Sequence, residues 1–164
     1  CEIAIIVAEQ DPHLQFNLTT RRHGTPQLAA FIKSPDYVHL ALRLRDRYAD
    51  HGLVSVMIAR CEGDVLDIDT WLMSCRVIGR TVEATMLEHL CRQAAQAGCG
   101  ILQGTYIPTQ KNAMAADAYA KYGFEPADHA NGHQVWRYDL RARGPITNAF
   151  VRNVDSWETL DGPP

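Results

Sequence analysis

The fold is decided by residues 73–90, MSCRVIGRTVEATMLEHL, where an extended apolar run gives way to a helical pattern. The preceding residues 65–74, VLDIDTWLMS, have the composition of a strand. Residues 81–96 then carry apolar side chains every four positions, which is typical of an amphipathic helix. Another strand pattern, ILQGTYI, follows at 101–107. We therefore predict a β-α-β unit whose two strands run parallel through a right-handed crossover.

Working outward, the segments before this unit also have strand patterns. The runs at 38–47, 53–60 and 65–74 are joined by turns so short that neighbouring strands must be antiparallel. The remaining predicted elements are a strand at 2–8, a short helix opened by Thr25-Pro26, a helix at 112–122, and a closing hairpin in which Phe-Glu-Pro is joined to 133–140 by ADHANG. Together they predict an α/β (α+β) domain, with a mixed, mainly antiparallel sheet and helices on both faces.

The bulk composition indicates one globular domain. The chain has 164 residues, of which 46% are hydrophobic and 21% charged, and we see no linker or internal repeat. We assign residues 1–140 to the domain. We expect residues 141–164, which have no clear period, to form a tail that packs loosely or not at all.

Charge and cysteine usage exclude several classes of partner. A net charge of −3 argues against nucleic acid, and no apolar run reaches the roughly 18 residues of a membrane helix. The five cysteines are odd in number and form no Cys-x-x-Cys pair, which predicts reduced thiols, no metal site and a cytoplasmic protein. They are Cys1, Cys61, Cys75, Cys91 and Cys99.

The junction between strand and helix is a candidate anion site. A strand that leads directly into a helix leaves the first backbone N–H groups of the helix unpaired, and the helix dipole favours a negative ligand there. Gly79 has no Cβ to obstruct such a ligand, and Arg76 and Arg80 add positive charge. The alternative is that Gly79 only permits a tight turn.

Two motifs extend this interpretation. Arg76-Val-Ile-Gly79-Arg80-Thr81 resembles the Arg/Gln-x-x-Gly-x-Gly/Ala pyrophosphate loop of the GNAT superfamily of N-acetyltransferases, from which Thr81 departs at the last position. Asn112 to Phe124 resembles the Asn…Tyr-x-x-x-Gly-Phe segment of the same superfamily. The resemblance implies a GNAT fold with a splayed parallel strand pair.

The resemblance also implies a cosubstrate, which is acetyl-CoA, another acyl-CoA or a phosphopantetheine arm, with no metal. Its pantetheine lies between the strands at 65–74 and 101–107, where the backbone of Leu72 and Met73 pairs with it. The pyrophosphate is bound by backbone N–H groups of Arg76, Val77, Ile78, Gly79, Arg80 and Thr81. Asn112 either binds the cofactor arm or caps its helix.

Two residues are candidates for catalysis. Tyr119 matches the position at which many GNAT enzymes carry the acid that protonates the departing thiolate, although it also fits ordinary helix packing. Asp69 is the candidate general base, if burial raises its pKa, and the strand pattern puts it on the same side as Asp67, Trp71 and Met73. The alternative is a solvated or salt-bridged carboxylate.

A narrower resemblance connects residues 15–126 with the C-terminal GNAT-like region of FkbH-like proteins. It is carried by QFNLTTRR (15–22), LRLRDRYADHGLVSVMIAR (42–60), IDTWLMSCRVIGR (68–80) and YIPTQKN (106–112). This resemblance implies a polyketide pathway in which the partners are a HAD-type glyceryl-transfer domain and an acyl carrier protein. The nucleophile loop of the HAD domain is missing from this chain. Two functions follow: an acyltransferase, or a non-catalytic module that docks carrier protein for a HAD-type partner. The oligomeric state is left open.

Overall fold

The computed structural model describes residues 14, 16–79, 81–110, 112–113, 116–130 and 132–149. The strand predicted at 2–8 lies outside these residues. The helices and strands of the described chain, in order, are β1 (Phe16–Asn17), α2 (Thr25–Lys33), β2 (Tyr37–Arg45), β3 (Asp50–Glu62), β4 (Val65–Met73), the 3-10 turn η1 (Cys75–Val77), α3 (Val82–Ala97), β5 (Ile101–Tyr106), α4 (Ala118–Lys121), β6 (Glu125–Ala130), β7 (His133–Asp139) and α5 (Leu140–Arg143).

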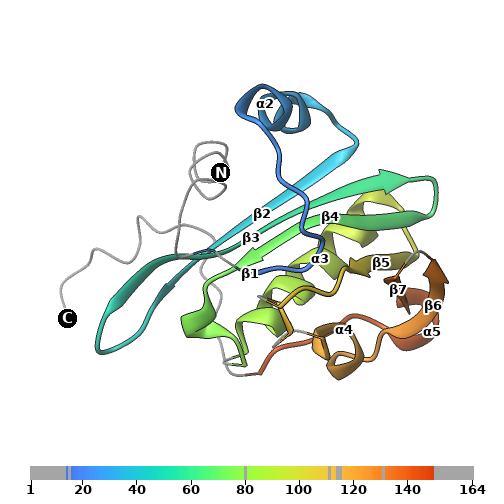
Figure 1. The fold of residues 1–164 in the computed structure, drawn as a ribbon. Helices are drawn as coiled ribbons and strands as arrows, with labels where there is room; N and C mark the ends of the chain where they lie inside the picture. The colour runs from blue at the N-terminus through green and yellow to red at the C-terminus, as the bar shows by residue number, and fades with distance from the viewer. Residues whose placement is uncertain are drawn as a thin grey trace.

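One mixed sheet organises the chain (Figure 1), with strand order β2-β3-β4-β5-β7-β6 and β1 pairing with β4 outside that path. The strands β2, β3 and β4 form the antiparallel meander that the short turns predict. The strands β4 and β5 are parallel and flank α3, so the predicted β-α-β unit is confirmed.

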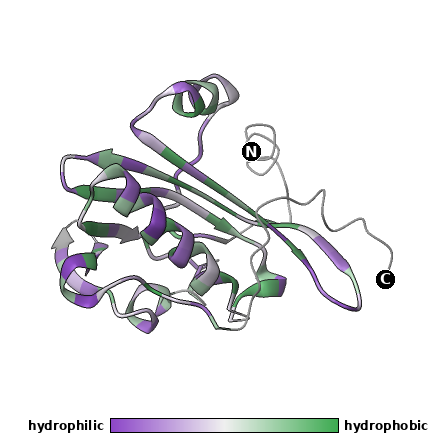
Figure 2. Ribbon diagram, turned by 180° about the vertical axis from the view of Figure 1, so that it is seen from behind, coloured by the Kyte–Doolittle hydropathy of each residue, from purple (hydrophilic) through white to green (hydrophobic). Residues whose placement is uncertain are grey.

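Helices lie on both faces of this sheet, as the sequence predicts. The larger core joins α3 and α4 to one face, where Met86, Leu90 and Tyr119 pack with Trp71. The smaller core on the other face joins Leu28 of α2 to the sheet. Figure 2 shows that α3 carries hydrophilic and hydrophobic residues on different sides, which is the pattern of a helix half-buried against a sheet.

A β-bulge at Asp69 changes which side chains of β4 face the larger core. The pairing with β3 moves from Ile58↔Thr70 to Ala59↔Ile68, so Asp69 is the extra residue. Trp71 therefore packs in the same core as Ile68. The prediction that Asp69 shares a side with Trp71 and Met73 is wrong, because strict alternation does not hold across a bulge.

Three predicted segments differ in extent. The helix expected at 112–122 is limited to Ala118–Lys121 among the described residues. The hairpin turn is shorter than ADHANG, because β6 continues to Ala130. In the predicted tail, Ile146 is only 9% exposed and its N–H lies 3.4 Å from the Cys91 Sγ, so this part packs against α3.

Candidate functional site

The two parallel strands of the sheet stay paired over only part of their length. Their ladder runs from Val65↔Ile101 to Ile68↔Gly104, whereas β4 continues to Met73 and β5 to Tyr106. The bulge at Asp69 is the next residue of β4 after the ladder ends. Beyond that point the backbone of β4 pairs with another segment on this side.

That segment is β1, which occupies the place predicted for pantetheine. Phe16 pairs with Met73 and Asn17 with Leu72, in antiparallel register. Leu18 then donates its N–H to the Trp71 carbonyl at 3.4 Å and accepts from the Ile107 N–H at 2.9 Å. Residues 16–18 therefore lie between β4 and the chain just after β5, beside the β1 label in Figure 1. The backbone of Leu72 and Met73 is thus paired within the protein.

Asn112 holds this arrangement together. Its amide nitrogen donates to the Asn17 carbonyl at 3.0 Å and to the Ile107 carbonyl at 2.9 Å, and its Oδ1 accepts from the Thr109 N–H at 2.8 Å. The residue is 2% exposed. Both amide hydrogens are therefore used internally. Sequence reasoning considered a cofactor contact or a helix cap for Asn112 and missed its bond to β1, since nothing local in the sequence signals it.

Tyr119 lies directly where the ladder ends. It is completely buried against Trp71 and Phe124, with ring centroids 6.0 and 5.1 Å away. A Cβ built on Gly104 would stand 2.4 Å from its hydroxyl oxygen, so only glycine leaves room for the phenol there. Among the described residues, the hydroxyl has no hydrogen-bond partner. Burial, with the charge of Asp67, raises the pKa of Tyr119, so the phenol stays protonated.

Asp69 is an ionised carboxylate surrounded by donors. It lies 2.5 Å from Arg21, 2.6 Å from the Nε2 of His23 and 2.8 Å from the Thr70 hydroxyl. Burial favours a higher pKa, but the hydrogen bonds from Thr70, Arg21 and His23 outweigh it and lower the pKa of Asp69. Of the two alternatives for Asp69, the contacts therefore favour the salt-bridged carboxylate, and the raised pKa that a general base would need is not found.

The neighbouring carboxylate behaves in the opposite way. Asp67 accepts one side-chain hydrogen bond, from Gln103 at 3.0 Å. Burial raises the pKa of Asp67 despite that bond. Two aspartates of one strand therefore have pKa values shifted in opposite directions, and the difference lies in the number of donors that tertiary structure brings to each.

These shifts predict opposite pH profiles for two matched variants. A carboxyl group whose pKa is lower in the folded state stabilises the protein at pH values above its unfolded pKa. This stabilisation is lost as the pH falls through the folded pKa. Asp69→Asn is therefore expected to reduce the free energy of unfolding at pH 7 by about 1.5–3 kcal/mol and to flatten its dependence between roughly pH 2 and 5. Asp67→Asn is expected to raise stability at pH 7, because a raised folded pKa penalises the ionised form. Urea unfolding across this pH range measures both, and equal profiles for the two variants contradict the assignment.

The predicted pyrophosphate loop contains an internal anion. Gly79 has a positive φ of 75°, so glycine is needed for the turn itself. Its N–H donates to the Glu83 carboxylate at 2.5 Å, and Glu83 is only 4% exposed. A carboxylate is favourable at this helix N-terminus. Arg76 is exposed and contacts the Ser74 hydroxyl at 3.3 Å, while Arg80 lies outside the described residues.

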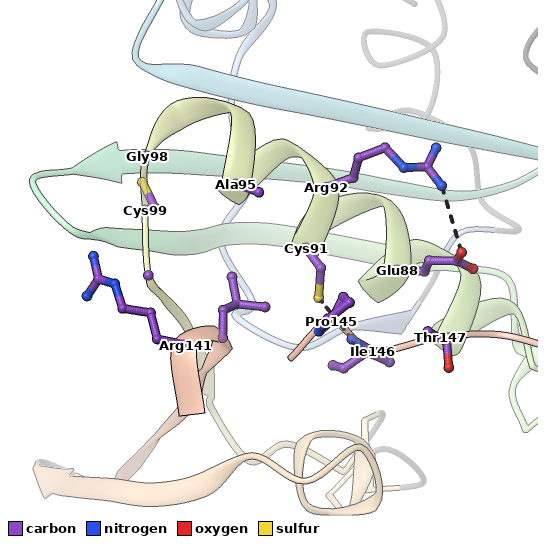
Figure 3. Close-up of a pocket in the computed structure, with 12 residues that line it drawn as sticks. Glu88, Cys91, Arg92, Ala95, Gly98, Cys99, Arg141, Pro145, Ile146 and Thr147 are labelled. Carbon is purple, nitrogen blue, oxygen red and sulfur yellow. Dashed lines mark hydrogen bonds and ion pairs between the residues drawn. The ribbon is translucent and has the colours of Figure 1, made fainter. Parts of the chain in front are cut away.

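A groove of about 580 Å³ lies elsewhere, between α3 and the segment that follows β7. Figure 3 shows Cys91, Ile146 and Arg141 around it, with the ion pair of Glu88 and Arg92 on one side. None of the predicted site residues lines this groove. In the described part of the chain, no helix is long and apolar enough to cross a bilayer, and no three His, Cys, Asp or Glu side chains group as metal ligands.

The sequence matches no protein-family model and no curated protein. Solved structures, however, share the fold. The ribosomal-protein-S18-alanine N-acetyltransferase from Escherichia coli aligns with a TM-score of 0.58 and 16% identity, over 90% of this chain and 89% of that one. The GNAT domain of S. lividans PAT aligns with a TM-score of 0.63 and 14% identity, over 85% of each chain. PaiA N-acetyltransferase from Thermoplasma acidophilum, in complex with coenzyme A, aligns with a TM-score of 0.57 and 12% identity, over 70% of this chain and 68% of that one. The protein therefore has the fold of the GNAT-superfamily N-acetyltransferases.

Proposed function

We propose that the protein transfers an acyl group from a pantetheine thioester at the point where the β4–β5 ladder ends. In this proposal the pantetheine arm replaces β1 along Leu72 and Met73. The backbone from Arg76 to Thr81 lies next along the chain as the candidate seat for the phosphates. The coenzyme A complex of a protein with this fold supports the same class of cosubstrate.

The observation that carries the proposal is the Tyr119 hydroxyl, a fully buried donor that finds no acceptor in the part of the chain that the structure describes. Leaving such a group unsatisfied costs about 1–3 kcal/mol. A thioester sulfur at the end of the ladder supplies an acceptor. Because burial raises its pKa, Tyr119 acts in this proposal as a hydrogen-bond donor to the departing sulfur. Asp69, held ionised by Arg21 and His23, stabilises the positive charge that develops on an attacking amine.

The position of β1 bears on which donor is used. Removing it exposes the fully buried Leu18 and breaks three hydrogen bonds: Leu18 N–H to the Trp71 carbonyl, Ile107 N–H to the Leu18 carbonyl, and the Asn112 amide to the Asn17 carbonyl. At about 1.5–3 kcal/mol for the side chain and 0.5–1.5 for each of these bonds, the total is roughly 3–7.5 kcal/mol. A micromolar Kd corresponds to a binding free energy of only about 8 kcal/mol. Displacing β1 would use a large part of it, so free acyl-CoA competes poorly for this site. A docked carrier protein adds its own contacts and presents its arm at about millimolar effective concentration.

A second candidate function is favoured by the same occupancy. β1 pairs with Leu72 and Met73, and the Glu83 carboxylate accepts the hydrogen bond of the Gly79 N–H. If β1 never leaves, the protein is a non-catalytic module that docks acyl carrier protein for a HAD-type partner domain. The resemblance to FkbH-like proteins supports this polyketide context and the carrier-protein donor of the first candidate.

Calorimetric titration with acetyl-CoA and with holo acyl carrier protein tests the proposal in the wild type and in Asn112→Ala. Because Asn112 bonds to the Asn17 carbonyl, its loss is expected to weaken β1 and to raise acetyl-CoA affinity roughly 2–12-fold, the equivalent of one hydrogen bond. Thr109→Ala is the matched control, since the Thr109 hydroxyl accepts from the Asn112 N–H at 3.2 Å and, within the described part of the chain, makes no hydrogen bond to β1. It is expected to leave acetyl-CoA affinity unchanged.

The outcomes separate the candidates. Binding of holo carrier protein, followed by acyl transfer to an amine detected by mass spectrometry, supports the acyltransferase. Equal binding of the holo and apo carrier proteins without transfer supports the docking module. If neither ligand binds the wild type or Asn112→Ala, a pantetheine site between β4 and β5 is ruled out.

A further inference from the structure

Two cysteines distant in sequence meet outside the candidate site. Cys61 is near the end of β3, and Cys99 follows Gly98 at the end of α3. Their Sγ atoms are 2.8 Å apart, although the residues are 38 positions apart. That separation exceeds the length of a disulfide bond by only about 0.8 Å. Cys75 is exposed, and the buried Cys91 instead contacts the Ile146 N–H.

The backbone around the pair is fixed without help from the thiols. The Asp64 carbonyl accepts from the N–H groups of Gly100 and Ile101 at 3.0 and 3.1 Å. The Asp64 carboxylate accepts from the Gly100 N–H at 2.8 Å and pairs with Arg141. Both sulfur atoms lie 3.8 Å from the Gly63 carbonyl oxygen. The turn after β3 and the start of β5 therefore hold the two sulfurs together, and a bond between them needs only a small side-chain adjustment.

We infer that Cys61 and Cys99 form a disulfide bond by exchange with a low-molecular-weight disulfide. The Cys61 thiolate attacks one sulfur of that disulfide, forming a mixed disulfide and releasing one thiolate. The Cys99 thiolate then attacks the Cys61 sulfur, forms the internal bond and releases the second thiolate. The two protein thiols lose two electrons and two protons, and the small disulfide is reduced to two thiols.

The surroundings determine the order of these steps. Cys61 is partly exposed, whereas Cys99 is 4% exposed. Burial, followed by the hydrogen bond with Cys61, raises the pKa of the Cys99 thiol. Cys61 is therefore the entry point and Cys99 the resolving thiol. The bond joins the two ends of the unit that contains β4 and α3, so it covalently closes the part of the fold that carries the candidate site.

The test is oxidation of the folded protein with oxidised glutathione, followed by alkylation, trypsin digestion and mass spectrometry. Trypsin leaves Cys61 and Cys75 in one peptide, residues 61–76, and Cys99 in residues 93–111. We therefore use Cys75→Ser as the parent, so that a cross-link between these peptides identifies the Cys61–Cys99 bond. The expected result is a linked pair lighter by two hydrogens, with a rise in Tm of roughly 8–16 °C that dithiothreitol reverses.

Cys61→Ser in the same parent is expected to abolish both the link and the rise in Tm. Because Cys61 is partly exposed, this variant keeps the packing of the buried Cys99. Full alkylation of Cys61 and Cys99 after oxidation of the folded parent would overturn the inference. So would a link from Cys61 to Cys91 or between molecules as the main product.

Discussion

Gly104→Ala is expected to lower the free energy of unfolding by about 3 kcal/mol, equivalent to a fall in Tm of roughly 6–12 °C. The new Cβ would stand 2.3 Å from the Cζ of Tyr119 and 2.4 Å from its hydroxyl oxygen. Tyr119 has no solvent-exposed surface and its ring packs on Trp71 and Phe124, so it has no free direction of movement. Chemical denaturation followed by tryptophan fluorescence measures the change.

Gly100→Ala is the matched control. Its Cβ would also be too close to a neighbour, 2.3 Å from Arg141, but that neighbour is the end of a flexible, exposed side chain that can move away. The loss is expected to be much smaller than for Gly104→Ala, because an exposed ion pair contributes little to stability. Gly104→Ala combined with Tyr119→Leu should recover part of the stability lost by Gly104→Ala alone. Equal stability of the two alanine variants contradicts the proposed packing of Tyr119.

Tyr119→Phe is expected to reduce the rate of acyl transfer by the proposed acyltransferase roughly 10²–10³-fold without reducing stability. The phenol is the proposed donor to the departing sulfur, so its loss affects the transfer step. The same change removes a buried donor that has no acceptor among residues with described positions, which leaves the free energy of unfolding unchanged or higher by about 1–3 kcal/mol. Turnover with acylated carrier protein and urea unfolding are measured on the same preparation.

Tyr106→Phe is the control for this pair of measurements. Tyr106 is 3% exposed and its hydroxyl donates to the Asn112 carbonyl at 3.4 Å. Its loss is expected to cost about 0.5–1.5 kcal/mol and to leave the transfer step unchanged. If Tyr119→Phe instead transfers at the wild-type rate, Tyr119 serves packing alone and the non-catalytic module becomes the better interpretation.

Much of the fold could be predicted from the sequence because the determining signals are local. The short turns require antiparallel neighbours among β2, β3 and β4. The four-residue spacing of apolar side chains places α3 on the sheet, and the crossover makes β4 and β5 parallel. The turn at Gly79, the alternative that the sequence left beside an anion site, is present, and its positive φ needs glycine. The narrower resemblance to FkbH-like proteins stays a prediction.

The sites depend on contacts that no local pattern encodes. The bulge at Asp69 arises from pairing with β3, and it moves Trp71 to the other side from the one strict alternation gives. Burial raises the pKa of Asp69, but hydrogen bonds from its neighbour Thr70 and from Arg21 and His23, which reach it from 48 and 46 positions away, lower it.

The sequence by itself therefore determined the meander and the β-α-β unit, because each follows from the period or turn chemistry of a short segment. Only the tertiary structure decided that β1 lies along β4, that Asn112 holds it and that Cys61 meets Cys99. Each of these joins segments far apart in the chain, and such contacts form only when the whole sheet and core bury their apolar surface together.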